Sequence, residues 1–224
     1  MAYGSVGGTE TWRAVTMKAP ASGTVSIAKG DAVKVTDAFT VSNATSAEDV
    51  VIGEALAAAS ENDALVPVKV SGISRFGFTG VSPTVDGAAG VLASATDGKV
   101  KTPASGNGAG RNLKVHVTAQ TLTLSSVQAA DAVTINGLTF TAHATVTTAA
   151  NREFSISGDD AADAAELESV INDGTYGVPG VTASADGAVV TLTADDGVHT
   201  AVAVTDAAGT ITAAVTAGYV WVLL

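Results

Sequence analysis

The chain has no cysteine, only five prolines and few aromatic residues among its 224 residues. Without cysteine it can form neither a disulfide nor a thiolate metal site, so packing and assembly must supply its stability. Aromatic residues make up 4% of the sequence, which is few for a cleft that stacks sugars. The apolar residues are mainly alanine and valine, and glycine is plentiful, a composition that favours short twisted strands joined by tight turns over a helical bundle.

Basic residues are almost absent from the second part of the chain. Residues 1–118 carry 10 acidic and 10 basic residues, whereas residues 119–224 carry 12 acidic residues and a single basic one, Arg152. The whole formal net charge of −11 therefore falls after residue 118. Two such different compositions indicate two modules with different surfaces.

The last seven residues, 218–224 (GYVWVLL), are uncharged and strand-like, and so resemble the first module rather than their acidic neighbours. We therefore predict an acidic domain, residues 119–216, inserted into a neutral β-domain that comprises residues 1–118 and 217–224. An insertion is tolerated where its two ends lie close together at a surface loop of the host domain. The expected junctions are the loops at 118–120 and 216–218.

Segments that would place the chain in a membrane, direct it to secretion or bind nucleic acid are also missing. The first residues, MAYGSVGGTE, have neither a basic start nor an apolar stretch, so we predict no secretion signal and a flexible arm over about residues 1–11. No uncharged apolar run approaches the ~20 residues that cross a bilayer. The bases are scattered singly, whereas nucleic-acid binding needs a clustered positive face. We expect a protein made in a cytoplasm, with no membrane and no nucleic acid among its partners.

Alternating apolar residues predict several strands in the first module. Lys29-Gly30-Asp31 is typical of a turn and predicts a hairpin, and Asp97-Gly98 predicts a second one. Pro67 indicates a sheet edge or a bulge, because proline cannot donate to a neighbouring strand. Leu113, Val115 and Val117 are expected to share one face. The predicted strands cover residues 11–17, 24–27, 32–36, 50–59, 65–70, 72–78, 91–94, 99–101 and 111–118.

The acidic module has an order of its own. Asn136-Gly137 and Asp186-Gly187 predict two hairpins, because these residues tolerate positive φ. Between them, Asp159 or Asp160 can cap a helix over residues 161–172, in which Ala165, Leu167, Val170 and Ile171 approximate an apolar stripe. Residues 200–204 add a strand, and 210–215 return the chain to the first module. The predicted fold class is mainly β: a small β-barrel or sandwich domain with an inserted α+β domain built as hairpin, helix, hairpin.

Few residues point to chemistry. His116, His143 and His199 are isolated in the sequence, so structural histidines are favoured over metal ligands. Asp159-Asp160 and residues 195–197 lack the spaced oxygen ligands of a calcium loop. No Gly-X-Ser-X-Gly elbow or phosphate-binding glycine loop is present. We predict no catalytic residue, no metal, no cofactor and no enzyme activity.

Several segments, in this order, resemble a family of tailed-bacteriophage head decoration, or cement, proteins. The acidic module likewise resembles a small β-rich module that recurs in phage virion proteins. Each segment alone is ordinary turn-and-strand sequence; the order carries the resemblance, which covers most of the chain. The segments of the first module are the N-terminal arm, 30–35 (GDAVKV), 51–56 (VIGEAL), 90–100 (GVLASATDGKV) and 218–224; those of the second are 131–140, 170–173 and 181–192.

The resemblance implies a non-enzymatic virion protein on the outer surface of an expanded capsid, assembled in the host cytoplasm. Its expected partners are the major capsid protein and further copies of itself, as a homotrimer at three-fold positions. In such proteins the arm adds a strand to capsid loops, where main-chain hydrogen bonds supply affinity. The candidate capsid-interface residues are Tyr3, Trp12 and Arg13, because aromatic residues and arginine dominate interface energetics. Trp12 has an alternative role, filling the β-core.

Two other functions stay open from the sequence. The inserted module is not confined to phage heads, so a tail-tube or tail-spike accessory protein is one alternative. A bacterial surface or adhesion β-protein is another, because such proteins share the richness in alanine, threonine, valine and glycine. The missing secretion signal weakens the second alternative.

Overall fold

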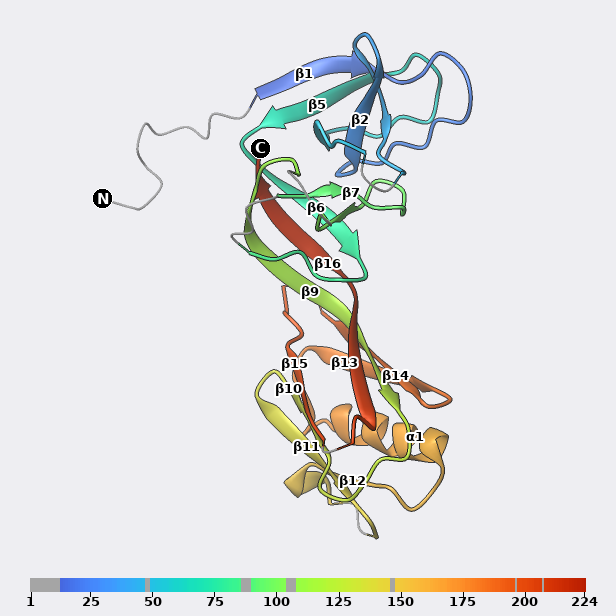
Figure 1. Cartoon of the computed structure of the whole chain (residues 1–224), viewed down its shortest axis with the longest axis vertical. Coiled ribbons are helices and arrows are strands. Elements are labelled where there is room, and N and C mark those ends of the chain that lie inside the picture. Colours follow the sequence, from blue (N-terminus) through green and yellow to red (C-terminus); the bar gives the residue numbers. More distant parts are fainter. Residues whose placement is uncertain are drawn as a thin grey trace, which may run out of the picture. The chain divides into compact units, whose positions relative to one another are not determined.

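The computed structural model describes residues 13–46, 49–85, 90–103, 108–145, 148–195, 197–206 and 208–224 (Figure 1). The chain forms two compact units: a first unit, Met1–Val115 with Tyr219–Leu224, and a second unit, His116–Gly218. The fold is mainly β, with a closed five-stranded barrel and one α-helix in the described residues, which confirms the predicted fold class. Of the helices that these residues form, none has the length and apolar character needed to cross a membrane.

The first unit begins with a small barrel. Its strands follow one another in the order β1-β3-β2-β4-β5. Alternation along β5 places Val66 and Val68 inside, while Leu65 is exposed. Most of the buried residues of the barrel are valine and alanine, small enough to fill an interior closed by five strands. The strands are β1 (Arg13–Lys18), β2 (Ala32–Asp37), β3 (Thr40–Asn43), β4 (Gly53–Ala55) and β5 (Leu65–Ser71).

The prediction of a hairpin around Lys29–Asp31 is wrong. Residues 24–27 form no strand, and only an isolated bridge joins Ile27 to Ala59. The Asp31 carboxylate instead accepts a hydrogen bond from the Ala28 N–H (2.8 Å), which closes the turn on itself. The hairpin partner of β2 is β3, and Phe39 in the turn between them takes φ 51°. That turn contains no glycine, so no local pattern in the sequence predicts it.

Two further expectations in the barrel need correction. The strand predicted over 50–59 shrinks to β4, Gly53–Ala55. Pro67 does not lie on a sheet edge, because it pairs with Thr16 of β1 and its carbonyl accepts from the Leu56 N–H (2.9 Å). A proline is tolerated here because Leu56 lies beyond the last residue of β4, where the regular ladder has ended.

A sheet completes the first unit, with the order β9-β16-β6-β8-β7. The predicted hairpin at Asp97-Gly98 is confirmed: β7 and β8 pair antiparallel, and Gly98 takes φ 65°. Phe76 and Val222 are fully buried on the core face of this sheet. The strands are β6 (Ile73–Thr79), β7 (Leu92–Ala93), β8 (Val100–Lys101), β9 (Arg111–Leu124) and β16 (Ile211–Leu223).

The two expected junction loops do not exist, because β9 runs through residues 118–120 and β16 through residues 216–218. Each of these long strands belongs partly to both units (Figure 1). The terminal segment 218–224 lies in β16, which joins β6 and β9 rather than the five-stranded barrel. Neither junction contains a proline, and Gly218 is buried within β16, so nothing there stops extended backbone.

The second unit combines two sheet segments with the helix. One is a four-stranded sheet with the order β12-β11-β10-β15, and in the other β13 pairs with β14, which pairs with β9. The predicted turn at Asn136-Gly137 is confirmed, with φ 50° and 84°. The elements are β10 (Ala132–Ile135), β11 (Leu138–His143), the short helix η1 (Ala149–Asn151), β12 (Glu153–Ser155), α1 (Asp160–Ile171), β13 (Val181–Asp186), β14 (Val189–Ala194) and β15 (Val202–Thr205).

Helix α1 starts where the sequence predicts. Asp159 is the N-cap, and its carboxylate accepts from the Ala162 N–H (2.9 Å). The buried stripe differs by one position, since Ala164 is buried and Ala165 is exposed. Asp163, an acid on the buried side of the helix, was not expected there.

Candidate functional site

The structure describes only one of the three predicted interface residues. Tyr3 and Trp12 lie outside the described residues. Arg13 is the exposed first residue of β1, and its backbone N–H donates to the Ser71 Oγ (3.1 Å). The hydrogen bond fixes the start of β1 against the end of β5, and it leaves the guanidinium side chain in solvent.

A second surface of the first unit has the stronger character of an interface. Along β6, Ser74 and Phe76 are buried while Ile73 and Arg75 are exposed. The same alternation places Tyr219, Trp221 and Leu223 of β16 on the exposed side, because successive side chains point to opposite faces of a sheet. At the start of β9 the alternation is interrupted, since the consecutive residues Leu113 and Lys114 are both exposed. We call the exposed side the outer face; it consists of Ile73, Arg75, Leu113, Tyr219, Trp221 and Leu223.

Cations cover both aromatic rings of the outer face. The Arg75 guanidinium carbon lies 4.6 Å from the centroid of the Tyr219 ring. The Lys114 ammonium lies 5.2 Å from the centroid of the Trp221 ring. Contacts of this kind contribute about 0.5–1 kcal/mol each at exposed sites. They also hold the two cations in place, so that less side-chain entropy is lost when a partner binds.

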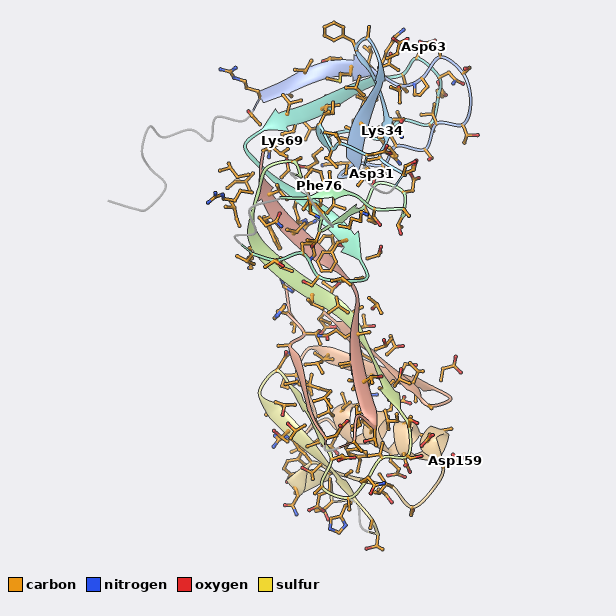
Figure 2. All side chains as sticks on the ribbon, viewed as in Figure 1. Asp31, Lys34, Asp63, Lys69, Phe76 and Asp159 are labelled. Carbon is orange, nitrogen blue, oxygen red and sulfur yellow. The ribbon has the colours of Figure 1, made fainter. Side chains whose placement is uncertain are left out.

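Two more lysines add positive charge to the same surface. The Lys99 side chain runs across β6 at Gly77, where glycine leaves space. A Cβ atom added at Gly77 would lie 3.0 Å from the Lys99 Cδ. The Lys69 ammonium donates to the Ile73 carbonyl (Figure 2 labels Lys69). Strands β6, β8, β9 and β16 contain no acidic residue. The first unit is neutral as a whole, yet this sheet is basic.

Aliphatic side chains lie beside the charged ones. Ile73, Leu113 and Leu223 are 48%, 42% and 46% exposed. Tryptophan, tyrosine and arginine are the residue types enriched at protein interfaces and among the residues that contribute most to binding. The outer face therefore has the composition of a surface that binds another protein.

The sequence did not single out this surface. The sequence predicts the uncharged strand 218–224, but Arg75 and Lys114 belong to segments far from it along the chain. Their meeting with Tyr219 and Trp221 depends on strand order, in which β16 lies between β6 and β9. The absence of acids from these strands was a signal that could have been read.

Two of the histidines, which are isolated in the sequence, lie next to each other in the structure. The rings of His116 and His199 lie 5.6 Å apart at 85° in the second unit. Both contact backbone: the His116 Nε2 lies 2.5 Å from the Val198 carbonyl oxygen, and the His199 Nδ1 accepts from the Val117 N–H (3.0 Å). His143 is exposed at the end of β11.

The acidic pairs take structural positions in the described residues. Asp159 caps α1, and the Asp160 carboxylate accepts from the Ser126 N–H (2.6 Å). Asp195 is exposed, and Asp196 lies outside the described residues. Within the described ranges, no three histidine, aspartate or glutamate side chains gather in a group that could hold a metal ion.

Comparisons of the chain with protein-family models, curated proteins and solved structures gave no match. The assignment of a function therefore depends on the surfaces described above and on the order of sequence segments.

Proposed function

We propose that the chain is a non-enzymatic structural protein that binds the outer surface of a phage capsid and stabilises the expanded head. In this proposal it forms a trimer on the major capsid protein. The sequence resemblance to head decoration proteins supports the class of function. The single structural observation that carries it is the separation of roles between the two units.

That separation has three parts. The first unit has an overall neutral sequence and carries the N-terminal arm. The second unit carries 12 acidic residues and one basic residue, which suits a unit that faces away from the shell, toward solvent or a neighbouring copy. Arg13, where the N-terminal arm joins the barrel, is exposed and available to a partner.

Assembly would strengthen a weak individual contact. A short arm and a few side chains give one copy only a small interface with a shell. In a trimer, three such interfaces act together, and the second and third form at a high effective concentration. This multivalency lets a small domain bind an assembled capsid while it binds free capsid subunits poorly.

The test is to mix the purified chain with undecorated expanded heads and image the particles by cryo-electron microscopy. We expect ordered density at three-fold positions and higher resistance of the heads to heat. A variant lacking residues 1–11 is the matched comparison and should bind less. Heads that remain bare at saturating protein, or density on tails alone, would overturn the proposal.

A further inference from the structure

The outer face of the first unit is basic, whereas the second unit is acidic. The outer face of the first unit has Arg75, Lys99 and Lys114 on or beside it, and its strands contain no acid. The second unit has 12 acids and one base. We propose that the outer face binds the acidic second unit of another copy of this chain.

A protein partner explains the outer face better than a nucleic acid does. Stacking platforms for single strands leave aromatic rings open to the bases. Here Arg75 and Lys114 already cover the rings of Tyr219 and Trp221. Aliphatic side chains exposed by 42–48% surround them, and these suit burial against protein. The net charge of −11 also repels nucleic acid at long range.

Among protein partners, a second copy supplies the complementary surface itself. Contact between two outer faces would bring like charges together, which is unfavourable. Contact between an outer face and an acidic unit pairs opposite charges, and it joins two different patches of the molecule. Such a head-to-tail contact closes into a ring when the rotation between copies allows it. A three-membered ring would be the trimer of the proposed function, but the inference does not depend on any capsid.

The second unit offers acids that can make this contact. Glu166 on α1, Asp186 at the end of β13 and Asp195 after β14 are all exposed. On α1, the exposed neighbours of Glu166 have short side chains, including Ala162, Ala165 and Ser169, which leave room for a partner to approach. Arginine and lysine held by aromatic rings can meet these carboxylates with little ordering cost.

The experiment measures the mass of the full chain by light scattering after size exclusion, at about 50 mM and about 1 M NaCl, because salt screens contacts between exposed charges. We expect an assembly at low salt that dissociates at high salt. The double reversal Arg75→Glu with Lys114→Glu should lower the association constant by about 100-fold, which corresponds to two tenfold steps of 1.4 kcal/mol. The triple substitution Glu166→Gln, Asp186→Asn and Asp195→Asn, which neutralises three acids, should also weaken the association.

The matched control reverses two exposed lysines of the barrel, Lys18→Glu with Lys29→Glu, and should associate like the wild type. Circular dichroism confirms that each variant is folded. A wild-type chain that stays monomeric at both salt concentrations overturns the inference. So does an assembly whose mass is the same at both salt concentrations, or one that still forms when Arg75 and Lys114 are replaced by glutamate. Binding of a labelled single-stranded oligonucleotide that the reversal abolishes would assign the face to nucleic acid instead.

Discussion

At the scale of single residues, Asp163 is an acid in an unfavourable place. It is 4% exposed on the inner side of α1, and its Oδ1 has no hydrogen-bond partner among the described residues. Burial raises the pKa of Asp163 above its ordinary value, a hydrogen bond from Gly158 partly opposes that rise, and the charges of Asp160, Asp159 and Glu166 add to it. By contrast, N–H donors of Tyr176 and Thr175 lower the pKa of the Asp173 carboxyl.

The raised pKa of Asp163 predicts a pH dependence of stability. The folded state binds the proton at a higher pH than the unfolded state, so the cost of the buried charge is full above the raised pKa and falls as the pH drops toward 3.8. At pH 7, Asp163→Asn should therefore have a free energy of unfolding higher than that of the wild type by on the order of 1 kcal/mol, measured by urea titration. That advantage should shrink as the pH falls toward 3.8.

The control for Asp163 is Asp186→Asn, which removes the same charge from the exposed end of β13 in the same unit. Its stability difference from the wild type should depend on pH much less. If urea titrations give parallel pH curves for the wild type and Asp163→Asn, the buried carboxylate does not destabilise the unit.

At the scale of elements, the barrel depends on how closely β4 approaches β5. A Cβ atom at Gly53 would overlap the Lys69 carbonyl oxygen and come within 2.8 Å of the Val68 Cγ1. Only glycine lets the two strands pair here as Glu54↔Lys69 and Ala55↔Val68. Because β4 is three residues long, it has little further pairing with which to absorb a shift.

Gly53→Ala should therefore destabilise the first unit by about 1–3 kcal/mol, the usual cost of forcing extra atoms into a packed site. Both tryptophans of the chain belong to this unit, so their fluorescence during urea unfolding reports its stability. The control is Gly174→Ala, at a position with open space. It should change the free energy of unfolding of the second unit, followed by circular dichroism in urea, by less than about 0.5 kcal/mol. Equal effects of the two substitutions would contradict the close-approach argument.

At the scale of the whole molecule, charge divides the chain as the fold does. The first unit balances its acids and bases, whereas the second has 12 acids against one base and so repels itself. Self-repulsion of a compact acidic domain is reduced when salt screens it, over a Debye length of about 10 Å at 0.1 M. The two units should therefore respond differently to ionic strength.

Raising NaCl from about 20 mM to about 200 mM should slow amide hydrogen exchange in β10 and β11 of the second unit by several-fold, because screening removes repulsion there. Exchange in the barrel strands β2 and β5 should change little. Neutralising Glu166, Asp186 and Asp195 should reduce the response of the second unit. An equal change in both units would show that net charge does not set the difference. The measurement uses the Arg75→Glu, Lys114→Glu chain, so that self-association does not add protection.

The elements that the sequence predicted well are those with strong local signals. Asn136-Gly137, Asp97-Gly98 and Asp186-Gly187 need only backbone that accepts positive φ, and each turn lies where it was expected. The Asp159 cap of α1 is local in the same sense. Signals of this kind fail where a residue other than glycine or asparagine adopts a positive φ, as Phe39 does between β2 and β3.

Composition, charge pattern and turn chemistry were enough to establish a mainly β chain with a neutral and an acidic part, because these properties are carried by neighbouring residues. Only the tertiary structure decided that the two parts share the long strands β9 and β16 rather than loops. It also brought Arg75 to Tyr219 and Lys114 to Trp221. The physical reason is that strand order and register depend on hydrogen bonds between segments that lie far apart in the sequence, and no local pattern specifies those partners.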